Sequence, residues 1–219
     1  MAKRRTSGRD AEPDGAKAVR TRRRILEAAA EVLAEKGFAG TRLIDIAEVA
    51  EVQAPAIYYY YESREALIEA VVMEGTRNAT IQVEIILGEL TDADPVARLL
   101  AAVEGHLRVA MHGSAFTLAS IRNSGQLPDD MRARKQVEET KYGRIWRGLV
   151  ADVADAGLLR ADLNPVAAQM LIIGAMNWSP EWWTPKLASL DEVVDTAKAL
   201  ITGGLLTAKN DQPALTPSR

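Results

Sequence analysis

Few residue types in this chain can carry out catalysis or bind a metal. The 219 residues include no cysteine and two histidines, which excludes a disulfide scaffold, a thiolate metal site and a cysteine nucleophile. His106 and His112 are six residues apart, so on a helix they would lie on different faces. The sequence has neither a serine–histidine–acid set nor a glycine-rich phosphate loop after a strand. We therefore expect a protein that is not an enzyme, binds no metal and needs no cofactor.

Basic residues are concentrated at the N-terminus. Residues 1–24 carry nine basic and three acidic side chains, a net charge of +6, whereas the whole chain carries −3 and the remainder therefore −9. A basic arm on an acidic body is typical of a segment that binds a polyanion, and a solubilising tail is the alternative interpretation. Gly8, Pro13 and Gly15 favour disorder, so we expect residues 1–18 to form a flexible arm.

Four consecutive tyrosines, Tyr58–Tyr61, stand out in a chain with only 5% aromatic residues. Short helices are expected to position them. Residues 21–36 form one apolar stripe at helical spacing and end at Gly37, where glycine readily adopts a positive φ. We expect Thr41 to cap a second short helix, and a third helix to begin near Gln53 after a turn at 51–52. Pro55 then lies in the first turn of this third helix, where its missing N–H is harmless.

Three short helices with a tight turn between the second and third describe a helix-turn-helix. In such a motif the third helix enters the major groove, and residues at helix ends contact phosphates. Ile57 is expected to face inward, with Tyr59 and Tyr60 pointing away from it. Ser63 is expected to cap a fourth helix that runs to about residue 90. The residues expected to contact DNA are Thr41, Arg42, Gln53, Ala54, Pro55, Tyr58, Tyr59, Tyr60 and Arg64.

Residues 25–67, with the basic arm before them, resemble the TetR family of bacterial transcriptional regulators. The matching features are, in order, Gly37-Phe38, Thr41, Ile46-Ala47, the turn at 49–52, the aromatic run at 57–61, Arg64 and Leu67. The resemblance implies that Tyr58 and Arg64 contact phosphates, and that Tyr59, Tyr60 and residues 53–55 face bases. Two positions differ from the family pattern. Glu51 stands where the turn usually has glycine, and Tyr60 where histidine is common.

The rest of the chain keeps a helical rhythm, and no segment alternates as a strand would, so we expect an all-α fold. Further helices are expected at 95–111, up to about Gly125, at 129–157, at 165–177 after an Asn164 cap, and at 189–206. A loop containing Pro180 and Pro185 is expected between the last two. The expected domains are a helix-turn-helix DNA-binding domain at 19–70, a helical effector-binding and dimerisation domain at 71–208, and a loose tail at 209–219.

All four tryptophans lie after residue 145, and a buried tryptophan supplies a wide apolar wall. The residues expected to line an effector pocket are Met111, Phe116, Trp146, Trp178 and Trp182. Residues 176–183 resemble a segment of the subgroup that regulates fatty-acid and sterol degradation and binds acyl-CoA thioesters. That subgroup often has an arginine beside the aromatic pair, whereas this chain has Glu181 and Thr184. Packing in the core or in a dimer interface is the alternative interpretation of the tryptophans.

These features predict a homodimeric, ligand-responsive regulator that acts on double-stranded DNA. We expect a repressor that leaves a palindromic operator when it binds a small apolar or acyl-CoA-like effector. Helices 165–177 and 189–206 are apolar on more than one face, and these two helices and their mates are expected to form a four-helix interface. No run of 18 apolar residues is present, so we expect a cytoplasmic protein without membrane contact. A small all-α lipid carrier or enzyme that uses the C-terminal pocket is the alternative.

Overall fold

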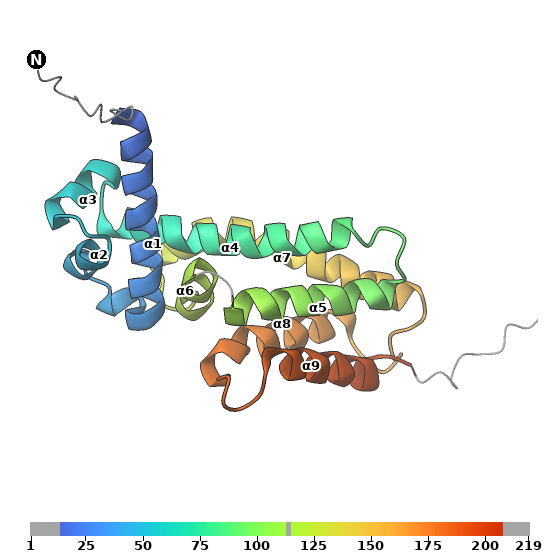
Figure 1. Cartoon of the computed structure of the whole chain (residues 1–219). Coiled ribbons are helices and arrows are strands. Elements are labelled where there is room, and N and C mark those ends of the chain that lie inside the picture. Colours follow the sequence, from blue (N-terminus) through green and yellow to red (C-terminus); the bar gives the residue numbers. More distant parts are fainter. Residues whose placement is uncertain (1–13, 113–114, 208–219) are drawn as a thin grey trace, which may run out of the picture.

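The computed structural model describes residues 14–112 and 115–207, and these residues form an all-α fold, as the sequence predicts (Figure 1). The helices are α1 Asp14–Gly40, α2 Leu43–Val49, α3 Ala54–Tyr60, α4 Arg64–Gly88, α5 Pro95–His112, α6 Ala115–Asn123, α7 Asp129–Asp155, α8 Pro165–Trp182 and α9 Leu190–Leu205. The strand-like pairing within the described residues is one isolated antiparallel bridge between Leu159 and Leu206. None of these helices combines the length and the apolar character that crossing a bilayer requires.

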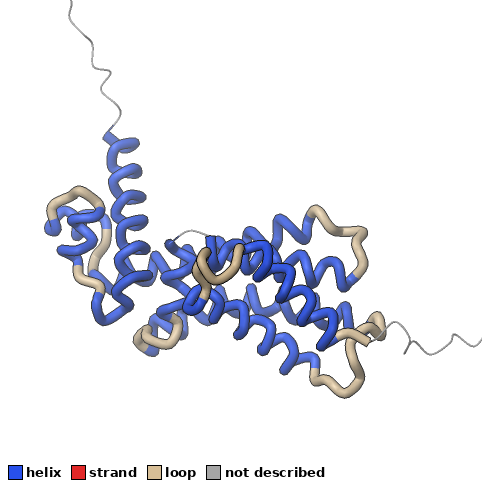
Figure 2. Tube along the Cα trace, turned by 60° about the horizontal axis from the view of Figure 1, so that its bottom comes forward, coloured by secondary structure: helices blue, strands red, loops and turns tan. Residues whose placement is uncertain are grey.

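The helices form two parts that α4 connects. Helices α1–α3 lie at one end, and α4 runs away from them to pack in a bundle with α5, α7, α8 and α9 (Figures 1 and 2). Each part has its own apolar core. Helix α6 belongs to the first core, because Phe116 and Ala119 are buried together with residues of α1 and the start of α4. The expected domain boundary at residue 70 therefore separates elements that share one core.

Helix α1 begins earlier than the sequence suggested. Thr21, where this helix was expected to begin, lies inside it, and its hydroxyl donates to the carbonyl of Lys17 at 3.0 Å. Alanine, lysine and arginine at positions 16–20 have high helix propensity and extend the helix towards the N-terminus. Residues 14–18 of the expected flexible arm are thus helical, while residues 1–13 lie outside the described residues. At the other end Gly37 has a φ of 70° and interrupts the helix, as expected.

Two other local expectations are wrong. Thr41 does not cap α2: it is buried, and its hydroxyl donates to the carbonyl of Gly37 at 2.7 Å, so it closes the end of α1 instead. Helix α8 continues past residue 177 and through Pro180 to Trp182. Proline cannot donate to the carbonyl of Met176, but the Ser179 hydroxyl donates to that carbonyl at 2.7 Å and replaces the missing bond.

Two expected helix caps, Ser63 and Asn164, are confirmed, and the structure adds a third at Ser189. The Ser63 hydroxyl accepts from the backbone N–H of Ala66 at the start of α4. Asn164 accepts from two backbone N–H groups at the start of α8, which has Pro165 as its first residue. Ser189 and Glu192 form a reciprocal capping box at the start of α9. These caps fix where the long helices of the bundle begin.

Candidate DNA-binding and effector sites

Helices α2 and α3 form a helix-turn-helix whose turn depends on Glu51. Its φ of 52° is the one positive value at a non-glycine position among the described residues. The N–H of Val52 donates to the carbonyl of Ala47 at 3.0 Å, and the N–H of Glu51 donates to that of Glu48 at 3.1 Å. This pair of bonds is the Schellman motif, which normally has glycine in the position of Glu51. The turn thus keeps the family geometry without the glycine.

The tyrosines of α3 divide between the surface and the core. Tyr58 is 60% exposed and Tyr59 is 82% exposed, so both side chains are available to a partner. Tyr60 is half-buried against the core of the first part, and its ring meets that of Tyr59 edge-on at 5.0 Å. The expectation that Tyr60 points away from Ile57 is therefore wrong. Residues three apart on a helix lie on the same side, which places Tyr60 beside buried Ile57.

Arg42 and Arg64, which were expected to contact phosphates, differ in their exposure and in the bonds they make within the protein. Arg42 is exposed at the start of α2 and pairs with Asp45 at 2.9 Å. Arg42 and Lys36 together lower the pKa of Asp45 to about 2. Arg64 is turned inward: its guanidinium donates to the carbonyls of Thr41 and Phe38. Arg64 therefore fastens the start of α4 to the end of α1.

The N-terminal turns of α1 carry further basic side chains at the same end of the molecule. Arg22 lies over the ring of buried Tyr61, 4.9 Å from its centroid. Arg23 lies over Phe116 at 5.0 Å and pairs with Glu27 at 2.7 Å. Arg24 is exposed. The arm residues Lys3, Arg4, Arg5 and Arg9 lie outside the described residues.

A cavity of about 490 Å³ lies within the helical bundle, lined by α4, α5, α6, α7 and α8. This volume is within the range of small-molecule sites. Its polar lining includes Thr76, His106, Thr117, Ser120, Lys135, Glu139, Tyr142 and Asn177. Apolar lining comes from Ala79, Ile121 and Ile173. The cavity thus combines a partly apolar wall with many hydrogen-bonding groups.

None of the five residues expected to line the effector pocket lines this cavity. Trp146 is fully buried behind it and touches the rings of His106 and Tyr142, which do line it. Met111 packs against the second core and Phe116 is buried in the first. Two of the tryptophans are at the surface: Trp178, which lines a second cavity, is 64% exposed, and Trp182 is 44% exposed.

Sequence reasoning missed His106, Lys135 and Tyr142 as cavity residues. One signal was available. His106 lies on the buried stripe of α5 with Leu99, Ala102 and Val103, where a polar residue needs a reason to be buried. The contributions of α6, α7 and α8 depend on how five helices pack, and no short motif records that.

The ionisable groups of this cavity are held in defined states. The Nδ1 of His106 lies 2.6 Å from the hydroxyl of Tyr142, and its Nε2 has no hydrogen-bond partner among the described residues. Burial lowers the pKa of His106 to about 4, against a smaller opposing effect of Asn177. The imidazole is therefore neutral near pH 7. Within the described residues, no group of histidine, aspartate and glutamate side chains is arranged to hold a metal ion.

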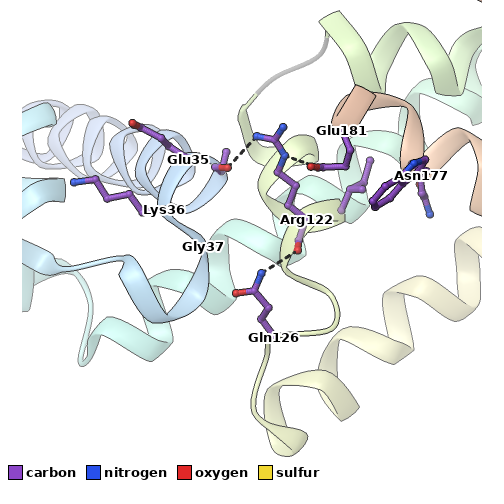
Figure 3. Close-up of a pocket in the computed structure, with 10 residues that line it drawn as sticks. Glu35, Lys36, Gly37, Arg122, Gln126, Asn177 and Glu181 are labelled. Carbon is purple, nitrogen blue, oxygen red and sulfur yellow. Dashed lines mark hydrogen bonds and ion pairs between the residues drawn. The ribbon is translucent and has the colours of Figure 1, made fainter. Parts of the chain in front are cut away.

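A second cavity, of about 650 Å³, lies where α1, α6 and α8 meet (Figure 3). Arg122 of α6 spans it. Its guanidinium donates to Glu181 of α8 at 2.7 Å and to the carbonyl of Ala34 of α1 at 3.1 Å. Ile121 and Asn177 line both cavities. The 490 Å³ cavity therefore borders the place where α6 and α8 meet the DNA-binding part.

Helices α8 and α9 expose an apolar face that no described part of the chain covers. Its largest side chains are Val166, Met170, Leu171, Trp178 and Leu200. Leu200 is 70% exposed. A Cβ added at Gly174, Gly203 or Gly204 would meet no atom within 4 Å, so packing within the described chain does not require glycine at these positions. Exposed apolar patches of this kind mark interaction sites.

Comparison with known proteins gives matches along most of the chain. Residues 25–71 match the family of bacterial regulatory proteins, tetR family, and residues 92–205 match the tetracyclin repressor-like C-terminal domain. The regulator HbdR of Aromatoleum sp. (strain CIB) is 26% identical over 193 residues, covering 86% of this chain and 82% of that protein. The repressor NicS of Pseudomonas putida is 30% identical over 158 residues, covering 70% and 72%.

Solved structures share the fold. AibR in complex with isovaleryl coenzyme A and operator DNA aligns with a TM-score of 0.74 at 22% identity, covering 82% of this chain and 97% of that one. The ketosteroid transcriptional regulator KstR2 of Mycobacterium tuberculosis aligns with a TM-score of 0.74 at 20% identity, covering 85% and 95%. At these identities the likeness establishes the arrangement of the helices and leaves the ligand of this chain open.

Proposed function

The chain belongs to the TetR family of DNA-binding transcriptional regulators, and on this premise we propose that it is a repressor released from its operator by a small molecule. The observation that carries the proposal is that α6 has two roles. Thr117 and Ser120 line the 490 Å³ cavity, whereas Phe116 and Ala119 are buried in the core of the helix-turn-helix. A ligand that displaces α6 acts directly on the DNA-binding part.

On the DNA side, Tyr59 and residues 53–55 face bases, and Tyr58 and Arg42 contact phosphates. The exposure of both tyrosines and of Arg42 supports these roles. Thr41 and Arg64 hold α1, α2 and α4 in register through the bonds described above. Because residues 25–70 carry nine acidic and three basic side chains, much of the attraction to DNA comes from the arm.

The repressor works as a homodimer in the cytoplasm, where its DNA lies. The exposed apolar face of α8 and α9 is the proposed contact with a second copy, in a four-helix interface. One recognition helix reads too few base pairs for genomic specificity, which is why two are needed. Their half-sites then lie one helical turn apart, about 34–36 Å, and form a palindrome.

The effector is a small apolar molecule or an acyl-CoA-like thioester. The cavity volume suits a small molecule, and a coenzyme A conjugate would leave the bulk of its nucleotide part outside. The structure of AibR, which holds isovaleryl coenzyme A and operator DNA, supports the second class because it shares this fold. A ligand shifts an equilibrium toward the state that it binds more tightly. Such a ligand releases the operator when it favours the one of two dimer shapes that fits DNA less well.

A mobility-shift assay tests the function. The full chain is mixed with the DNA upstream of its own gene and, as a control, with an unrelated fragment of the same length and base composition. The proposal expects a discrete complex on the first fragment that survives a salt concentration at which the second is released. Equal binding to both fragments at every salt concentration would exclude an operator there. Native mass spectrometry of freshly purified protein then searches for a bound small molecule.

A further inference from the structure

Lys135 is the buried cation of the 490 Å³ cavity, and its protons are all in use. An ammonium group has three donors. Here they go to the carbonyl of Ser120 at 3.2 Å, to the hydroxyl of Ser124 and to the carboxylate of Glu139 at 2.6 Å. Glu139 also neutralises the charge of Lys135. An anionic ligand inside the cavity would therefore have to displace Glu139 before it reached this buried cation, whereas Arg147, which also lines the cavity, is exposed.

His106, by contrast, has an unused group. The Tyr142 hydroxyl lies 2.6 Å from Nδ1, and the pKa of Tyr142 is raised by burial, so it stays protonated. A phenol is a stronger acid than a neutral imidazole, so the phenol donates and Nδ1 accepts. The single proton of the neutral ring is then on Nε2, which makes no hydrogen bond of normal geometry among the described residues, although the Asn177 side chain is near enough to raise the pKa of the ring.

A second buried group in the same cavity is also unpaired. The Thr117 hydroxyl of α6 has no hydrogen-bond partner among the described residues, although it is buried. Leaving a buried donor unsatisfied is unfavourable, so both groups favour a ligand atom that accepts. Asn177 of α8 also borders the cavity. An acceptor bound here would contact α5 through His106 and lie against α6 and α8.

We propose that the effector has an uncharged carbonyl group that accepts a hydrogen bond from Nε2 of His106. The inference rests on the proposed function, because it names the ligand class of that same cavity. A ketone, ester, amide or thioester has such a carbonyl. A carboxylate at His106 is disfavoured, because burying an anion needs a charged partner: the three donors of Lys135 are in use, and Arg147, the other cation that lines the cavity, is exposed.

Four probes of matched chain length test this: 2-octanone, 1-octene, octanoate and octanoyl-CoA. Binding to the full chain is followed by tryptophan fluorescence, because the ring of Trp146 lies 6.0 Å from that of His106. The ketone is expected to bind about fivefold to tenfold more tightly than the alkene, which is the size of one hydrogen bond. Octanoate is expected to bind more weakly than the ketone. Binding of octanoyl-CoA but not of the ketone would identify the thioester as the source of the carbonyl and support the inference.

Variants separate the hydrogen bond from a merely structural role. H106F should remove the preference for ketone over alkene, or lower octanoyl-CoA affinity about tenfold, and leave alkene binding unchanged. H106Q keeps a neutral donor and should retain most of the preference. Tyr142→Phe frees Nδ1 and should lower the preference about twofold to fivefold, which keeps the test valid if H106F does not fold. H112F alters the exposed histidine of the same helix and should change nothing.

Three results would overturn the inference. One is an unchanged ketone preference in both H106F and Tyr142→Phe, another is tighter binding of octanoate than of the ketone, and the last is no binding of any probe. The mobility shift of the ligand-free protein is independent of these results. An operator complex without carbonyl binding would therefore reject the ligand class alone, whereas loss of the operator complex would reject the proposed function.

Discussion

Replacing Glu51 by glycine should stabilise this protein. Glu51 occupies the position after α2 where the backbone has a φ of 52°. Gly157 occupies the equivalent position after α7, with a φ of 71° and the same two hydrogen bonds, from Leu158 to Val153 at 3.0 Å and from Gly157 to Ala154 at 2.9 Å. The chain thus contains the same motif once with glutamate and once with glycine, so the turn at Gly157 is an internal control for the turn at Glu51.

The expected magnitude follows from the backbone. A left-handed conformation costs an L-residue about 1–2 kcal/mol. Glycine avoids that cost but gives back about 0.4–1 kcal/mol through the greater freedom of the unfolded chain. Glu51→Gly should therefore raise the free energy of unfolding by about 0.5–1 kcal/mol. Gly157→Ala should lower it by a similar amount, because a Cβ there would meet no atom within 4 Å and only the backbone term changes.

Urea unfolding measures both changes, at one fixed protein concentration because dimer formation stabilises by mass action. Glu51→Ala is the matched control: it removes the carboxylate but keeps the Cβ and the backbone cost. If Glu51→Ala stabilised as much as Glu51→Gly, the charge of Glu51 and not its backbone would be the cause, and the reasoning would be refuted. Both variants remove a negative charge from the DNA-binding part and should bind any DNA sequence somewhat more tightly.

Four further predictions concern the DNA face, the arm, the dimer and pH. Tyr59→Ala should reduce discrimination between operator and random DNA by about 1–3 kcal/mol without lowering the melting temperature, since this side chain is 82% exposed; a loss of stability would contradict the assignment. Deleting residues 1–13 removes four basic residues and should flatten the dependence of DNA affinity on salt concentration; an unchanged slope would show that these residues do not contact DNA. Leu200→Glu should give folded monomers with little operator affinity, so a variant that stays dimeric by light scattering would disprove the interface. The pKa of His106 is lowered from 6.5 to about 4 in the folded protein, so stability should fall as pH drops from about 6.5 towards 4, and urea titrations should find a weaker fall in His106→Gln.

The sequence predicted those features that a few neighbouring residues decide. Ser63 and Asn164 cap helices because a side-chain oxygen reaches a backbone N–H two or three residues ahead, whatever the rest of the chain does. Thr41 has the same local option, but its hydroxyl meets the carbonyl that Gly37 leaves free at the break in α1. Pro180 stays helical because Ser179 supplies the missing donor. Both exceptions arise from a competing partner that composition and spacing do not reveal.

The candidate sites divide in the same way. The helix-turn-helix lies within about 40 residues, so its motif records it, although the side chains of Thr41, Tyr60 and Arg64 turn inward to partners that the motif does not reveal. The cavity draws on five helices between Gly75 and Asn177, and packing alone brings them together. Tryptophan content was a poor guide to it, because Trp146 is buried behind the cavity while Trp178 lies on the face assigned to the partner copy.

The packing of α6 restricts how a ligand can move it. At its first turn, a Cβ added to Gly75 of α4 would lie 2.1 Å from the carbonyl oxygen of Phe116, so the two backbones are in close contact and cannot approach further. At its last turn, α6 is tied to α1 by Asn123, which is buried and donates to the carbonyl of Leu33 at 3.2 Å, and by Arg122, whose side chain is 33% exposed. On the proposed function, a ligand that presses on Thr117 and Ser120 would therefore move α6 and α1 together. The bonds of Asn123 and Arg122 to Leu33 and Ala34 would pass this movement to the helix from which the DNA-binding part is built.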